Sequence, residues 1–206
     1  MSKIIPPARP RLSAGQLIEM IEKRGIEFSK HPLIIAGVRG YYTKTMGDPT
    51  KDDIGIYDDA IFLLTENMMA AFNGNTDPSK RRPGQGFGSL KGMARLQPGA
   101  WLSYKFAQHS GPSTPPYDAI CQRAGPVTVM RDGITQDYEH TGNFGINIHR
   151  GSMNSTSSEG CQTIYPTQWL EFIVSAQSQA KRIFGTQWKS VTLPYVLMTH
   201  AELPAG

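Results

Sequence analysis

The sequence predicts one α+β domain that is rich in short strands and carries a helix near each end. Of its 206 residues, 39% are hydrophobic, which supplies a core and excludes a wholly disordered chain. The 21 glycines and 15 prolines are too many for a helical bundle and indicate frequent turns between short strands. The expected strands follow one another instead of alternating with helices, which favours α+β over a parallel α/β sheet.

The N-terminal helix is predicted from its capping residues. Residues 1–12 are proline-rich and indicate an extended arm. Ser13 and Gln16 have the spacing of a capping box, in which each side chain satisfies a free backbone N–H at a helix start. Gly25 stands where helices commonly end. A short helix is therefore expected over 14–24.

The second helix is predicted from an apolar stripe between Pro166 and Gly185. The residues of that stripe are Trp169, Phe172, Ile173, Ala176, Ala180 and Ile183. The sequence shows no internal repeat and no linker. We therefore expect an arm with a short helix over residues 1–30, followed by one larger domain over 31–206.

Strands are predicted where apolar and β-branched residues alternate or run together. The expected segments are 33–42, 54–65, 101–107, 127–134, 144–149 and 191–198. Residues 73–92 have loop composition throughout. In the segment 144–149, Asn147 and His149 fall on the face opposite the buried one.

Charge and hydropathy narrow the classes of partner. The formal net charge is +4, and no stripe of Lys and Arg interleaved with aromatic residues is present, so a nucleic-acid partner is not expected. The weak positive field suits an anionic polymer such as the bacterial envelope. No run approaches the length of a membrane span, and the N-terminus lacks the apolar region of a secretory signal. We expect a protein made in the cytoplasm, without membrane insertion, that reaches any outside target by another route.

The two cysteines, Cys121 and Cys161, do not form a disulfide framework or a zinc motif with paired ligands. One bridge between them and two separate thiols are both compatible with the sequence. A zinc site built from His109, His140, His149 and Cys161 is disfavoured because these residues lack ligand spacing. No metal or other cofactor is therefore expected.

The segment from His149 to Cys161 has the residue types of a nucleophilic site. A strand is expected to end at His149, a loop of small polar residues follows, and Ser158-Glu-Gly160 leads into Cys161. A cysteine attacks carbonyls as a thiolate, and a neighbouring imidazole can take its proton. A glycine before the nucleophile lets backbone N–H groups turn toward a developing oxyanion.

This segment resembles the signature of L,D-transpeptidase catalytic domains, in which a histidine, a variable loop and Ser-His-Gly-Cys follow one another. His149, Ser158, Gly160 and Cys161 match that pattern, and the resemblance covers about residues 142–164. It implies a β-rich sheet core of the L,D-transpeptidase type. It also implies peptidoglycan as the partner and Cys161 as the nucleophile.

In the mechanism that this resemblance implies, His149 is the base and then the acid. The carbonyl of Arg150 or Gly151 would orient it, and main-chain N–H groups near Gly160 and Cys161 would hold the oxyanion. Ser158, Asn147 and, at the cleft edge, His109 are the expected substrate-binding residues.

The chain departs from the family pattern at Arg150, at Glu159 and at Gln162, and its loop is shorter. These departures suggest a divergent branch, such as a phage endolysin delivered with a holin-type protein or an antibacterial effector delivered by a secretion system. The expected function is cleavage of peptidoglycan stem peptides through a Cys–His acyl-enzyme. The alternatives are a transpeptidase that forms or exchanges crosslinks, and a non-catalytic envelope-binding or virion structural module in which Cys161 is merely buried.

Other polar and aromatic residues are assigned structural roles. Asp58 and Asp59 are adjacent in a strand and point to opposite faces, which argues against joint acid–base work. Residues 73–77 are interpreted as a turn, and Tyr117 and Trp101 as packing residues.

Overall fold

The computed structural model describes residues 12–43, 46–48, 50, 52–86, 90–111 and 114–204. Nearly all of the expected proline-rich arm lies outside these residues. Within them, the helices are α1 (Ala14–Glu22) and α2 (Pro166–Phe184), with short 3-10 turns at Gly185–Gln187 and His200–Glu202. The strands are β1 (Leu33–Arg39), β2 (Asp59–Thr65), β3 (Met68–Asn75), β4 (Ala94–Leu96), β5 (Gly99–Gly111), β6 (Thr114–Gln122), β7 (Val127–Arg131), β8 (Tyr138–Gly142), β9 (Ile148–Arg150), β10 (Gln162–Ile164) and β11 (Leu193–Thr199).

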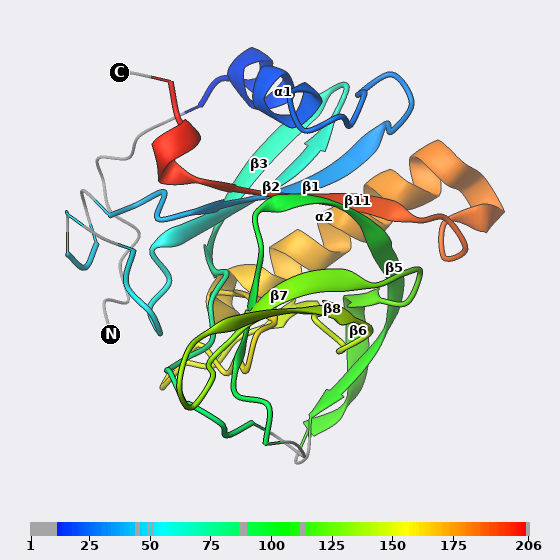
Figure 1. Ribbon diagram of the computed structural model, residues 1–206. Helices are drawn as coiled ribbons and strands as arrows, with labels where there is room; N and C mark the ends of the chain where they lie inside the picture. The colour runs from blue at the N-terminus through cyan, green and yellow to red at the C-terminus, as the bar shows by residue number, and fades with distance from the viewer. Residues whose placement is uncertain are drawn as a thin grey trace.

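The predicted α+β class is confirmed, and its main feature is a large mixed sheet (Figure 1). Eight strands close on themselves in the order β1-β11-β5-β6-β9-β10-β3-β2. The pairs β1–β11 and β9–β10 are parallel, and the other pairs are antiparallel. A separate three-stranded sheet has the order β4-β7-β8.

Two apolar clusters cover the two faces of β1, which explains why all seven of its residues are buried. Ile35 belongs to the cluster inside the closed sheet. Ile34 and Val38 belong to the outer cluster, where they meet Leu17 and Ile21 of α1. A strand with both faces covered is expected to be apolar at every position, as this one nearly is.

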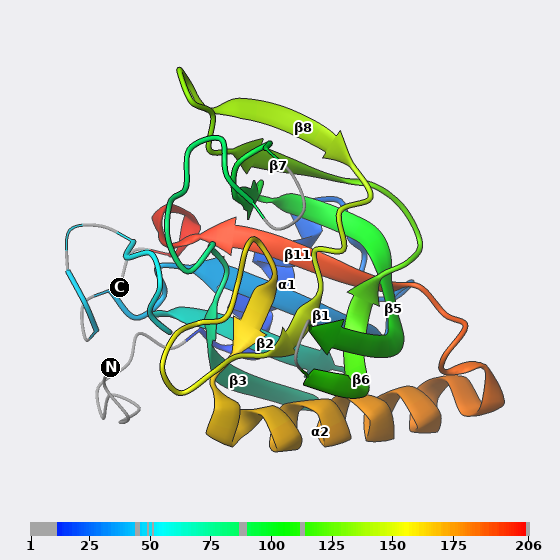
Figure 2. The same cartoon turned by 90° about the horizontal axis from the view of Figure 1, so that it is seen from below.

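Helix α2 lies along the opposite side of the sheet from α1 (Figure 2). Its buried stripe belongs to the inner cluster and comprises Trp169, Phe172, Ile173, Ala176 and Ala180. Pro166 occupies the first turn, where its missing N–H costs nothing, and Gly185 ends the helix with a positive φ of 56°. The prediction of this helix is confirmed.

Helix α1 begins as predicted. Ser13 accepts from the Gln16 N–H and the Gln16 side chain accepts from the Ser13 N–H, so the capping box is complete. The helix ends at Glu22, two residues before the predicted end, and Gly25 adopts a φ of 81° in the turn that follows. Among the described residues, no helix is long and apolar enough to cross a membrane.

Several strand predictions are wrong at their ends. Residues 73–75 are not loop, because β3 continues through Asn75 between β2 and β10. Residues 54–58 form turns ahead of β2. The strand expected over 144–149 is shorter in the structure and is displaced to β9, which pairs from Ile148 onward. The predicted segments include none of β3, β4, β6, β8 and β10.

Candidate active site

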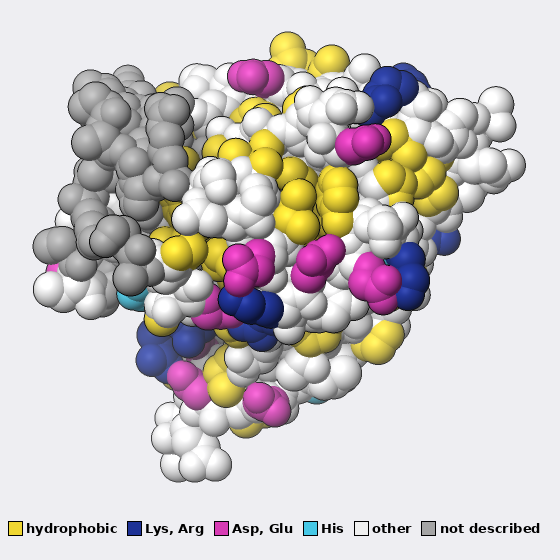
Figure 3. All heavy atoms as spheres, turned by 90° about the horizontal axis from the view of Figure 1, so that it is seen from above, with side chains coloured by type: hydrophobic (Ala, Val, Ile, Leu, Met, Phe, Trp, Pro, Cys, Tyr) yellow, Lys and Arg dark blue, Asp and Glu magenta, His cyan; other side chains and the backbone are white. Residues whose placement is uncertain are grey.

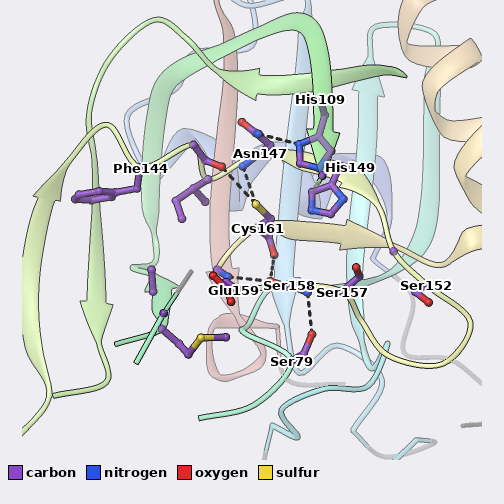
Figure 4. Close-up of a pocket in the computed structure, with 18 of the residues that line it drawn as sticks. Ser79, His109, Phe144, Asn147, His149, Ser152, Ser157, Ser158, Glu159 and Cys161 are labelled. Atoms are coloured by element: carbon purple, nitrogen blue, oxygen red, sulfur yellow. Dashed lines mark hydrogen bonds between the residues drawn. The ribbon is translucent and has the colours of Figure 1, made fainter. Parts of the chain in front are cut away.

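All eight candidate site residues line one cleft of about 1290 Å³. They are His109, Asn147, His149, Arg150, Gly151, Ser158, Gly160 and Cys161. Figure 4 shows His109, Asn147, His149 and Cys161 gathered around this pocket, with the Ser157–Glu159 turn below the cysteine.

The parallel pair β9–β10 places Cys161 and His149 on the same face. Its register matches Gln162 with Ile148 and Thr163 with His149. The Gln162 N–H donates to the Asn147 carbonyl at 2.8 Å, so the pairing extends one step and sets Cys161 opposite Asn147. Because side chains alternate along a strand, Cys161, Asn147 and His149 all point into the cleft.

The His149 ring is held by its Nδ1 atom. That atom lies 2.8 Å from the Arg150 carbonyl oxygen, which only accepts, so Nδ1 carries the proton and Nε2 keeps the lone pair. Burial and the neighbouring His109 lower the pKa of His149 to about 3, although the Arg150 carbonyl opposes the shift. At neutral pH the ring is therefore an uncharged base.

A second imidazole stacks on the first. The His109 and His149 ring centroids are 4.1 Å apart and the planes are 10° from parallel. Asn147 Oδ1 accepts from the Gln122 N–H, so its Nδ2 donates to His109 Nδ1 at 3.1 Å. His109 is thus neutral with its proton on Nε2, and burial lowers its pKa.

Tyr117 completes the surroundings of His149. Its hydroxyl lies 3.3 Å from His149 Nδ1, and the Arg150 guanidinium lies over its ring at 5.2 Å. Tyr117 packs against the inner cluster, as predicted, and in addition contacts His149. The sequence contains no local sign of this contact, because it depends on the pairing of His109 with Tyr117 across β5 and β6.

The Cys161 thiol is a neutral, hydrogen-bonded group. Its Sγ is 3.4 Å from the Gly145 carbonyl, to which it donates, and 3.4 Å from the Asn147 N–H, from which it accepts. Burial raises the pKa of this thiol to about 11, and the Asn147 N–H partly opposes that shift. The hydrogen bonds of the described residues include none between Sγ and His149, so the two groups share a cleft without forming a resting ion pair.

The turn before the cysteine is fixed by Ser158. Its Oγ accepts from the Gly160 N–H at 3.0 Å and donates to the Cys161 carbonyl at 2.7 Å. Ser79 anchors the same turn, since its Oγ accepts from the Ser158 N–H at 2.8 Å and its N–H donates to the Ser158 carbonyl. The Ser158 hydroxyl therefore holds the backbone of Gly160 and Cys161 in place.

Gly160 is required by shape. Its φ is 149°, and a Cβ at this position would lie 2.1 Å from the Ala94 carbonyl oxygen. Its N–H donates to Ser158 Oγ and would have to leave that partner in order to hold an oxyanion. The hydrogen bonds of the described residues include no acceptor for the Cys161 N–H, which is left as the main-chain donor beside the sulfur.

Gly151 allows a similar close contact on the other side of the loop. A Cβ there would lie 2.0 Å from the Tyr57 hydroxyl, which accepts from the Ser152 N–H and donates to the Ser152 carbonyl at 2.9 Å. The Gly151 N–H donates to the Ile164 carbonyl. Gly151 thus positions the loop, whereas the Arg150 carbonyl is the one that orients His149.

The cleft is markedly basic. Its lining includes one acidic residue, Glu159, and six basic ones: Lys80, Arg82, Lys91, Arg123, Arg131 and Arg150. By contrast, acidic and basic side chains are interspersed on the face that carries α1 (Figure 3). The modest net charge of the chain is therefore concentrated where an anionic ligand would bind.

Both cysteines are free thiols, and Cys121 is buried whereas Cys161 is partly exposed. The alternative of a bridge between them is not realised. Among the described residues, only Asp52, Asp59 and Asp77 bring three possible metal ligands within 4.8 Å of one another, and none of them lines the cleft. The histidines and Cys161 do not form such a group.

The interpretation of residues 73–77 as a turn is also corrected. Instead of forming a turn, 73–75 belong to β3, and Asp77 is buried with an ion pair to Arg39 at 3.3 Å. Asp58 and Asp59 are both buried near Asp77.

Comparison with protein-family models, with curated proteins and with solved structures finds no match to this chain.

Proposed function

We propose that the protein is a cysteine peptidase that cleaves peptidoglycan stem peptides through an acyl-enzyme on Cys161. One observation carries the proposal: Cys161 and His149 project into one cleft from the same face of the β9–β10 pair, two positions apart in its register, and the Arg150 carbonyl fixes the tautomer of His149. The partial exposure of Cys161 argues against a module in which this residue is only buried packing. The peptidoglycan substrate follows from the resemblance to L,D-transpeptidases and agrees with the basic cleft, since stem peptides carry free carboxylates.

The neutral resting state determines the first step. Substrate entry displaces the thiol from the Gly145 carbonyl, and rotation about the Cys161 Cα–Cβ bond turns it toward His149. The thiol proton passes to His149 Nε2 while Sγ attacks the peptide carbonyl carbon. Such catalytic contacts commonly tighten only once substrate is bound.

The next steps use the same groups. The Cys161 N–H donates to the oxyanion of the tetrahedral intermediate. When the carbon–nitrogen bond breaks, His149 Nε2 returns its proton to the leaving amine and a thioester remains on Cys161. Water, deprotonated by His149, then attacks the thioester, releasing a carboxylic acid and restoring the thiol. If an amine of a second stem attacks instead of water, the same intermediate yields a crosslink.

Digestion of purified sacculi tests this proposal. The wild-type protein is expected to release soluble muropeptides whose masses identify the hydrolysed bond, whereas Cys161→Ala and His149→Ala release almost none. Cys121→Ala is the matched control, because it removes the other free thiol, which does not line the cleft. Muropeptides of exchanged composition would identify a transpeptidase, and release by Cys161→Ala at the wild-type rate would refute the proposal.

A further inference from the structure

Arg131, the last residue of β7, is a buried cation in the wall of the cleft. It is 9% exposed. Its Nη1 donates to the Gly92 carbonyl at 3.1 Å, and its guanidinium carbon lies 4.6 Å above the centre of the Phe144 ring. Its Nε is buried without a hydrogen-bond partner. No carboxylate of the described residues forms an ion pair with it.

The other deeply buried arginine among the described residues has the opposite environment. Arg39 is 5% exposed, pairs with Asp77 at 3.3 Å and donates to Thr76 and to the Leu96 carbonyl. This is the usual arrangement, because a buried charge without a counter-ion is costly. Burial lowers the pKa of Arg131, as expected for a cation with little compensation.

Arg131 lies next to the turn that holds the nucleophile. It pairs with Ala94 across β4 and β7. The Ala94 N–H donates to the Glu159 carbonyl at 2.9 Å, and the Ala94 carbonyl packs against Gly160. Arg131 and Phe144 both line the cleft that contains Cys161 (Figure 4 shows Phe144). An anion bound there would sit on the same wall as the reacting sulfur.

We propose that Arg131 is a substrate-binding residue that receives a carboxylate of the peptide substrate. The guanidinium edge left unused by Gly92 provides the counter-charge, and the Phe144 ring holds the planar group in one orientation. A fixed planar fork suits a carboxylate, to which it can donate two parallel hydrogen bonds. The proposal deepens the proposed function and rests on it for the identity of the peptide. Arg131 would then be the side chain that makes the protein bind a peptide with a free carboxylate more tightly than the corresponding amide.

Binding to the full-length Cys161→Ala protein tests the proposal without turnover. The probes are a synthetic stem tetrapeptide with free side-chain carboxylates and the same peptide with those carboxylates amidated. Titration calorimetry is expected to give a dissociation constant at least about tenfold lower for the acidic peptide, as for a charge-assisted hydrogen bond of ordinary strength. Inorganic phosphate is added as a competitor. Displacement of the peptide by millimolar phosphate would show that Arg131 binds anions without preference for a carboxylate peptide, which would contradict the proposal.

Variants of Arg131 assign the preference. Arg131→Gln on the Cys161→Ala background is expected to bind both peptides equally, and Arg131→Lys to keep part of the preference. Arg182→Gln is the matched control, because Arg182 is an exposed arginine of α2 outside the cleft. Thermal unfolding establishes that each variant folds. If Arg131→Gln does not fold, the role of Arg131 is tested by comparing the binding of the acidic and amidated peptides to the parent and to Arg131→Lys.

The outcomes separate this proposal from the proposed function. An undiminished preference in Arg131→Gln, or in Arg131→Lys where Gln does not fold, would overturn the role of Arg131, as would equal binding or no binding of the two peptides by the parent. In each of these cases, digestion of sacculi by the wild-type protein remains a separate test of the proposed function. Conversely, an acid preference that depends on Arg131 in a protein that cleaves nothing would refute only the peptidase.

Discussion

The Arg150 carbonyl oxygen lies 2.8 Å from His149 Nδ1 and so decides which nitrogen of the ring can act as a base. The residue directly after the histidine orients the ring with its backbone carbonyl, so no carboxylate is needed as the third residue of a catalytic triad. Burial, and not this hydrogen bond, then leaves a neutral imidazole beside a neutral thiol. That differs from a pre-formed thiolate–imidazolium pair and can be measured.

Alkylation by iodoacetamide reports the resting state of Cys161. Because burial raises its thiol pKa to about 11, the rate constant should keep rising with pH through 9 and show no plateau near neutrality. The measurement is made on Cys121→Ala, which leaves a single thiol. A plateau below pH 7 would mean that His149 already holds the proton, contrary to this account.

The stacked imidazoles predict a shift in the titration of His149. Its pKa, about 3, is lowered by burial and by His109. Replacement of His109 by Phe keeps an aromatic ring in the stack and removes the second titratable group, so the pKa of His149 should rise. NMR of the ring protons measures this change. His140→Phe, which lies outside the cleft, should leave the titration unaltered.

Gly160→Ala should disrupt the turn before the nucleophile. The φ of 149° and a contact of 2.1 Å between the new Cβ and the Ala94 carbonyl both oppose it, and a loss of about 1–3 kcal/mol in the free energy of unfolding is expected. Muropeptide release should fall with it. Gly15→Ala in α1 is the control, since no atom lies within 4 Å of its Cβ, and it should stabilise the protein by up to about 1 kcal/mol. Equal stabilities of the two variants would contradict this view of the turn.

The buried carboxylates predict a loss of stability at alkaline pH. Burial raises the pKa of Asp52 to about 9 and that of Asp59 to about 8. Between pH 7 and 9 the folded state therefore binds more protons than the unfolded state, so the free energy of unfolding should fall as pH rises. His149 has a lowered pKa and acts in the opposite direction only below about pH 6.5, its ordinary value.

Urea denaturation at several pH values checks this prediction. Asp52→Asn should flatten the slope between pH 7 and 9, because it removes one of the proton-binding groups. Asp137→Asn, a change at an exposed carboxylate that pairs with Arg81, should not. A stability that rises over this interval in the wild-type protein would show that the cluster is ionised when folded.

The features that the sequence predicts well are those with local causes. Both helices were predicted from capping residues and an apolar stripe, since these act within a few residues. The grouping of His149 with Cys161 in one cleft was also anticipated, because a short polar loop joins the two strands that carry them.

The features that it missed depend on distant segments. β6 begins with Thr114-Pro-Pro, which argues against a strand, yet both prolines fall between its paired positions. β3 has no β-branched residue and is held by partners on both sides. Since Tyr117 reaches the site through β6 and Arg131 through β7, neither could be assigned to the cleft from its neighbours in the sequence.

Intact-protein mass spectrometry after acid quenching tests the central claim most directly. The wild-type protein mixed with a synthetic stem peptide should carry the mass of the acyl fragment, mapped by digestion to Cys161, and the Cys161→Ala protein should carry none. Hydrolysis of the peptide by the wild-type protein with no adduct, at a rate that Cys161→Ala reproduces, would contradict covalent catalysis by this residue.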